Sequence, residues 1–123
     1  MDWTGELRRR PFINTGEGDG ELTEYNCVLF PGEDHELTIQ AYAPGLEELT
    51  RFVLPEVREF LDGLDALIEN RDELDADLSQ VIYYQGRVGL VWWSRGMNNE
   101  FVGIYRPDPA GWRFLGFGDI FED

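Results

Sequence analysis

The chain has 123 residues, 42% of them apolar and 14% aromatic, and its 25 acidic residues outnumber 10 basic ones to give a formal net charge of −15. Every basic residue is an arginine. Disordered chains combine high charge with few aromatic residues, so this composition predicts a folded protein rather than an acidic tail. We expect one domain over residues 1–123, with an irregular segment at 1–20.

The charge also restricts the kinds of partner. Nucleic acid is bound through Lys and Arg that release counterions, and a field this negative repels phosphate and anionic membranes. No apolar run is long enough to span a membrane, Met1–Glu6 lacks a signal core, and the single cysteine, Cys27, suits a reducing cytoplasm. We therefore expect a cytoplasmic protein with no nucleic-acid or membrane partner. The acidity either steers a basic protein toward the chain or serves only solubility or a salty environment.

The N-terminal third predicts a loop followed by a hairpin. Glycine and acidic residues at 14–20 are typical of a flexible loop, and a short strand near Trp3–Leu7 is a further expectation. The runs Leu22–Phe30 and Glu36–Tyr42 then flank Pro31-Gly32-Glu33-Asp34, which predicts two antiparallel strands joined by a four-residue turn.

The middle of the chain predicts a helix. Apolar residues recur every three or four positions and form one stripe: Leu46, Leu49, Val53, Val57, Phe60, Leu64 and Leu67. Acidic residues occupy the opposite side: Glu59, Asp62, Asp65 and Glu69. Pro55 should kink or split the helix near Leu54. A second break is expected at Asn70, which could cap a short helix through Leu78 together with Glu73.

The last third predicts an antiparallel meander. Its strands are Val81–Tyr84, Val88–Ser94, Phe101–Arg106 and Trp112–Phe117, separated by turn residues. Apolar residues fall on both faces, because Trp92 should oppose Trp93, and Phe114 should oppose Phe117. The face away from the helix must be covered by the N-terminal strands, by sheet curvature or by a partner. The expected fold is α+β: an N-terminal β-hairpin, a kinked helix plus a short helix and a C-terminal antiparallel β-meander, with the helices on one face of five or six strands.

No catalytic or metal-binding motif stands out. The glycines at 16–20 lack the Gly-Lys-Ser/Thr of a phosphate loop, and no acidic cluster has the spacing of a calcium loop. The expected hairpin register pairs Cys27 near Thr38 and keeps it away from His35, the only histidine, so we expect neither a Cys–His nucleophile nor a transition-metal site. No cofactor is expected, and Arg8-Arg9-Arg10 is best explained by pairing with neighbouring acids.

These features favour a non-catalytic, acidic protein-binding module, of the type of an immunity or antitoxin-like inhibitor of a basic protein. The residues expected at the interface are acids of the helix and rings of the meander: Asp62, Asp65, Glu69, Tyr83, Trp93 and Tyr105. The alternatives are a small enzyme or ligand-binding domain with a cleft lined by Tyr84, Trp92, Trp93 and carboxylates, and a housekeeping domain whose acidity is environmental. A homodimer is compatible with each.

Overall fold

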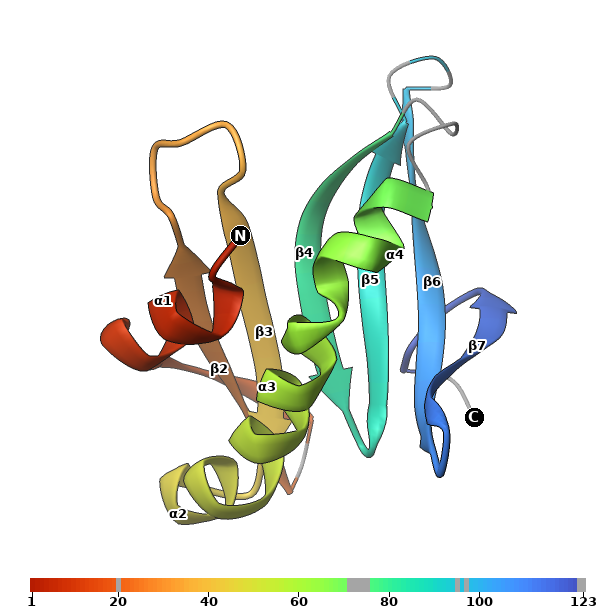
Figure 1. Ribbon diagram of the computed structural model, residues 1–123. Helices are drawn as coiled ribbons and strands as arrows, with labels where there is room; N and C mark the ends of the chain where they lie inside the picture. Colours follow the sequence, from red (N-terminus) through yellow and green to blue (C-terminus); the bar gives the residue numbers. More distant parts are fainter. Residues whose placement is uncertain (20, 71–75, 95, 97, 122–123) are drawn as a thin grey trace.

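A computed structural model describes residues 1–19, 21–70, 76–94, 96 and 98–121. It contains one seven-stranded sheet in the sequential order β1 to β7 (Figure 1). The strands are β1 (Ile13–Asp19), β2 (Leu22–Leu29), β3 (Leu37–Ala43), β4 (Ala76–Tyr84), β5 (Arg87–Ser94), β6 (Asn99–Asp108) and β7 (Gly111–Phe117). Neighbouring strands are antiparallel except for β3 and β4, which are parallel.

The α+β fold expected from the sequence is confirmed, with helices packed on one face of the sheet (Figure 1). The predicted hairpin is β2 and β3, and Cys27 pairs with Ile39, next to Thr38, near which its partner was expected. The predicted meander is β4 to β7. The sheet has more strands than expected because β1 joins it beside β2.

The parallel connection between β3 and β4 passes through the helices, as a crossover between parallel strands requires. The helical elements are α2 (Leu46–Glu48), the π-helical turn η1 (Leu49–Val53), α3 (Leu54–Asp62) and α4 (Leu64–Asn70). The π-helical turn η1 runs directly into α3, whose second residue is Pro55, so the predicted kink near Leu54 is confirmed.

The structure adds a helix break that the sequence did not predict, at Gly63 between α3 and α4. The helix ends at Asn70, where the sequence predicted a break. Residues 71–75 of the expected short helix lie outside the described residues, and Leu78 belongs to β4. The apolar stripe packs on the sheet as predicted from Leu49 to Leu64, whereas Leu46 at its start is exposed.

The N-terminal segment is more regular than the sequence predicted. Residues Trp3–Arg9 form α1, not a strand, because the Asp2 side chain caps it by accepting the Gly5 amide at 3.0 Å. The expected loop at 14–20 is largely strand, since β1 extends to Asp19 and pairs with β2 at Leu22. Gly20 lies outside the described residues.

A second core covers the face of the sheet that is turned away from the helices. It gathers Tyr42, Ile82, Tyr84, Val91 and Ile120. The segment after β7 closes it: the Gly118 amide donates to the Val102 carbonyl at 3.0 Å, and the Phe121 ring lies 5.0 Å from the Tyr84 ring between centroids. The sequence did not predict which of several elements covers this face of the sheet. In the structure the C-terminal segment covers part of it. Among the described residues, no helix has both the length and the apolar character needed to cross a bilayer.

Candidate partner-binding site

An acidic hollow lies where α1, α4, the β2–β3 loop and the start of β4 meet. Its volume is about 270 Å³. Its lining combines apolar side chains with three aspartates and the histidine: Met1, Trp3, Leu37, Ile68, Leu78, Asp34, Asp65, Asp77 and His35. We call this the acidic hollow. It is a concave site with apolar walls and negative charge.

Trp3 joins α1 to α4 beside the hollow. Its indole N–H donates to Asp65 Oδ1 at 2.8 Å, and the Met1 amine lies 2.5 Å from Asp65 Oδ2. The Met1 ammonium, together with the Trp3 donor, holds the pKa of Asp65 below its usual range. The Trp3 ring also lies edge-on to His35, with centroids 6.2 Å apart. The Asp65 side chain is therefore a fixed, ionised group.

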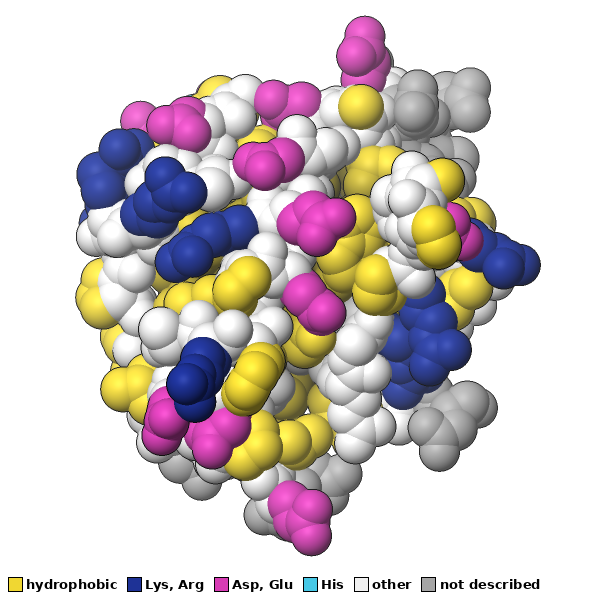
Figure 2. All heavy atoms as spheres, turned by 60° about the horizontal axis from the view of Figure 1, so that its bottom comes forward, with side chains coloured by type: hydrophobic (Ala, Val, Ile, Leu, Met, Phe, Trp, Pro, Cys, Tyr) yellow, Lys and Arg dark blue, Asp and Glu magenta, His cyan; other side chains and the backbone are white. Residues whose placement is uncertain are grey.

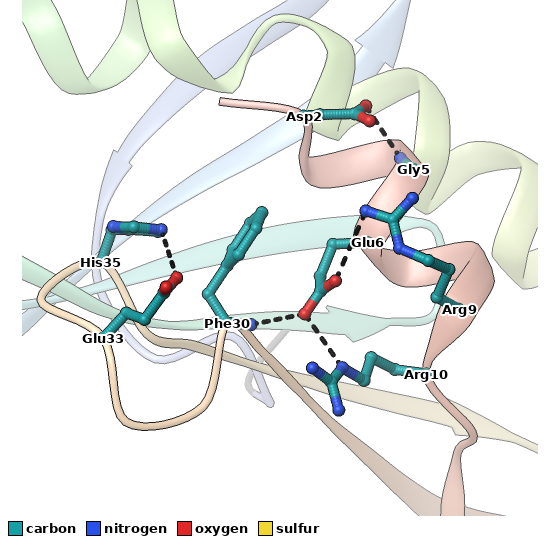
Figure 3. A network of polar contacts seen from close by, with 8 residues as sticks. All are labelled: Asp2, Gly5, Glu6, Arg9, Arg10, Phe30, Glu33 and His35. Carbon is teal, nitrogen blue, oxygen red and sulfur yellow. Dashed lines mark hydrogen bonds and ion pairs between the residues drawn. The ribbon is translucent and has the colours of Figure 1, made fainter.

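A buried carboxylate, Glu6, anchors α1 against the sheet (Figure 3). Glu6 is only 5% exposed. It accepts the Phe30 amide at 2.9 Å and the Arg10 guanidinium at 2.9 Å, and Arg9 lies 3.5 Å away. The Phe30 amide first, and Arg10 next, lower the pKa of Glu6. The arginine run thus pairs locally, as its sequence predicted for Arg9 and Arg10, and it fixes α1 next to the β2–β3 loop.

His35 closes the loop side of this region. Its Nε2 lies 3.0 Å from Glu33 Oε2, a distance that permits an ion pair although the groups do not meet in hydrogen-bond geometry. Its ring packs edge-on against Phe30, with centroids 4.7 Å apart. Cys27 is buried on β2, and burial raises the pKa of its thiol to about 11. A thiol that stays protonated at neutral pH is a poor nucleophile.

The predicted acids lie beside the hollow. Asp62, Asp65 and Glu69 are all exposed and follow one another along one side of α3 and α4. The Thr4 hydroxyl donates to Asp62 at 2.7 Å, so part of this acidic stripe also holds α1. Acidic side chains run down the middle of the face in Figure 2, with arginines to either side.

Two predicted ring anchors are corrected by the structure. Tyr83 and Tyr105 both lie in the core between helices and sheet. The Tyr83 hydroxyl donates to Glu56, and its pKa is raised, mainly by burial and then by the Glu56 carboxylate. Tyr105 packs against Phe60, with ring centroids 5.5 Å apart. Neither ring can anchor a partner from the surface. Trp93 is 37% exposed, so its predicted place at an interface stays a prediction.

The cleft expected for a small enzyme does not form from its three aromatic residues. Trp92 belongs to the helix-side core, Tyr84 to the core on the other face, and Trp93 is exposed. Within the described part of the chain, no three His, Cys, Asp or Glu side chains meet in a group that could hold a metal ion.

An aromatic patch that the sequence did not predict lies on β6 and β7. Phe114 and Phe117 share one face, with ring centroids 5.3 Å apart, and Phe117 also lies 5.3 Å from Phe101. They were expected on opposite faces, but a register shift between β6 and β7, with Gly116 at φ +128°, turns Phe117 round. Gly103 leaves room beneath the rings, because an added Cβ would lie 3.3 Å from Phe114. Phe117 remains 52% exposed.

Comparison with known proteins adds no relative. No family model, curated protein or solved structure matches this chain.

Proposed function

We propose that this chain is a non-catalytic, acidic protein-binding module that captures and blocks a basic protein, in the manner of an immunity or antitoxin-like inhibitor. The observation that carries the proposal is the acidic hollow together with the exposed carboxylates beside it. Charge alone would only steer a partner, whereas a concave apolar site with one carboxylate held in place, Asp65, also offers it a place to bind.

The chemistry of the hollow suits an arginine or lysine side chain. Such side chains place their apolar stems along hydrophobic walls and keep the charged head near polar groups. Leu37, Ile68 and Leu78 supply walls, and Asp34 and Asp65 supply negative charge. Trp3 contributes an aromatic ring of the kind that attracts cations.

Capture would proceed in two stages. The net charge of −15 accelerates the encounter with a basic surface, and salt screens this effect over about 8 Å at physiological ionic strength. Side-chain insertion into the hollow then sets the rate of dissociation. Exposed rings such as Trp93 or Phe117 would add contacts at the edges of a broad interface.

The direct test uses a defined cationic probe. A hexa-arginine peptide is titrated into ¹⁵N-labelled protein, with a hexa-glutamine peptide as the neutral control. We expect saturable shifts at amides around the hollow, such as those of Leu37, Ile68 and Leu78, with the arginine peptide alone. Diffuse shifts over every acidic surface would show charge attraction without a site and would favour the environmental explanation of the acidity.

Charge-reversal variants distinguish the effect of charge at the hollow from the effect of the chain's net charge. Asp34 and Glu69 are exposed and lie at or beside the hollow, and both are replaced by Lys in the test variant. Asp62 and Asp65 are left intact because they bond Thr4 and Trp3 of α1. The matched control replaces two exposed acids elsewhere, Glu21 and Glu47, and so changes the net charge equally. The first variant should weaken peptide binding at least about tenfold more than the second; equal losses would refute the site.

A pull-down experiment searches for the physiological partner. This protein is immobilised as bait and incubated with native lysate. Each captured protein is then purified, and the rate constants of its association with and dissociation from the bait are measured. The association rate constant of a genuine partner should fall steeply as the salt concentration rises. Its binding should be lost with the first variant but kept with the control variant. Retained binding by both variants would overturn the proposal.

A further inference from the structure

Three arginines lie side by side across the last three strands. Arg106 on β6 pairs directly with Arg113 on β7. The pairing of Val88 with Tyr105 places Arg87, the first residue of β5, next to Arg106. Val88 and Tyr105 point into the helix-side core, so the arginines alternate with them and face the other way. We call Arg87, Arg106 and Arg113 the arginine row.

The arginine row borders a hollow of its own. A cavity of about 280 Å³ is lined by Gln85, Arg87, Arg106 and Leu115. A tight turn with positive φ at Gln85 (+49°) and Gly86 (+78°) joins β4 to β5 and places Gln85 at the edge of this cavity. Arginines gather at the right of the face in Figure 2, where the lower ends of β5 and β6 in Figure 1 come forward.

This arrangement concentrates positive charge on a strongly negative chain. Like charges directly opposite on neighbouring strands repel each other. Within the described residues, no ion pair includes Arg106 or Arg113. Asp108 lies two residues further along β6, but its Oδ1 accepts the Ala110 amide at 3.0 Å. Two cationic side chains therefore remain available beside a concave surface.

We propose that the arginine row binds a small oxyanion, a phosphate or carboxylate group carried by a small molecule. The planar guanidinium fork matches two oxygens of such a group, and adjacent forks can hold it from two sides. Gln85 adds an amide donor at the edge. An extended polyanion would meet the repulsion of the whole chain, whereas a single small anion meets mainly the short-range field of the row, because salt screens charges beyond about 8 Å. The site does not depend on the proposed capture of a basic protein.

The test is a titration of ¹⁵N-labelled protein with inorganic phosphate at constant ionic strength, repeated with acetate. Amides of Arg87, Arg106 and Arg113 should shift saturably. The Arg106→Gln/Arg113→Gln variant should raise the Kd at least about tenfold, whereas Arg51→Gln, an exposed arginine on η1, should leave it unchanged. Saturation by phosphate alone identifies a phosphate site, and saturation by acetate alone identifies a carboxylate site.

Other outcomes would overturn the proposal. These are shifts that do not saturate with either anion, shifts spread equally over all arginines, or an unchanged Kd in the double variant. Both replaced residues are exposed, so the variant should fold, and its urea midpoint in chloride checks this. Chemical shifts are used for binding because phosphate stabilises most proteins by exclusion from their surfaces, without a specific site.

Discussion

Truncation of Ile120 tests whether the C-terminal segment completes the second core. Ile120 is 2% exposed and packs on the sheet face away from the helices. The Ile120→Ala change removes three carbons, worth about 0.8 kcal/mol each in transfer from water, or about 2.4 kcal/mol together. Incomplete closure of the space left behind adds to this, so the free energy of unfolding should fall by about 3–4 kcal/mol. Urea unfolding with an unchanged slope would measure the loss as a lower midpoint.

Gly89 supplies a second, coupled perturbation. An added Cβ at this position would lie 2.9 Å from Ile120 Cδ1 and 3.0 Å from Val102 Cγ1. Gly89→Ala should therefore destabilise the wild-type protein by about 1–3 kcal/mol through overpacking. Removal of the Ile120 methyl groups clears one of the two close contacts, so Gly89→Ala should cost about 1 kcal/mol less in the Ile120→Ala background.

The control is Ile13→Ala on the edge strand β1, where the side chain is 66% exposed. This change should lower stability by about 0.5 kcal/mol or less. If Ile120→Ala costs no more than Ile13→Ala, the C-terminal segment does not bury Ile120. Strict additivity of the Ile120 and Gly89 changes would show that the two residues do not touch, and the description of the second core would be wrong.

Two titration experiments test the buried groups. The lowered pKa of Glu6 means that its stabilising contribution is present above its ordinary pKa of 4.5 and is lost as pH falls through the lower folded-state value. Glu6→Gln should therefore flatten the acid limb of the stability–pH curve, and an unchanged limb would contradict the Phe30 and Arg10 contacts. The raised pKa of Cys27, about 11 against 9.0, means that its contribution is complete below pH 9 and is lost as pH rises toward 11. Native Cys27 should react with a thiol reagent at pH 8 only slowly, and quickly in urea; fast native labelling would show that the thiol is accessible.

Local patterns in the sequence were sufficient for much of the fold. The hairpin of β2 and β3 and the meander of β4 to β7 depend on alternation and turn chemistry between adjacent segments, which sequence shows directly. The helix kink at Pro55 follows from the missing N–H of one residue. In each case the cause and the structure lie within a few residues of each other.

The N-terminal segment could not be predicted in this way. A helix as short as α1 is marginal alone, and it is held here by partners distant in sequence, such as Asp62 for Thr4 and the Phe30 amide for Glu6. The strand β1 is glycine-rich, and pairing with β2 overrides its weak propensity. Such long-range contacts leave no periodic signal in the sequence.

The candidate site was predicted only in part for a related reason. Sequence alternation assigns residues to two faces, but it does not say which face carries the helices, so Tyr83 was placed outside when it lies in the core. A single bulge reverses the alternation, as it does between Phe114 and Phe117. The exposed acids of α3 and α4 were predictable because helical periodicity separates them from the buried stripe within one element.

Net charge is a sum, whereas binding depends on where each charge lies. The strand β4 carries Leu78 near its start, in the acidic hollow, and is followed directly by Gln85, at the cavity of the arginine row. Seven residues of extended strand separate them by roughly 20 Å, at about 3.3 Å per residue. That distance exceeds the screening length of about 8 Å, so an anion at one end should neither strengthen nor displace a cationic group at the other. Composition does not reveal this separation: strand register places the arginine row at one end of β4 and the acidic hollow at the other, and these are the two sites at which we propose that an anion and a basic protein bind.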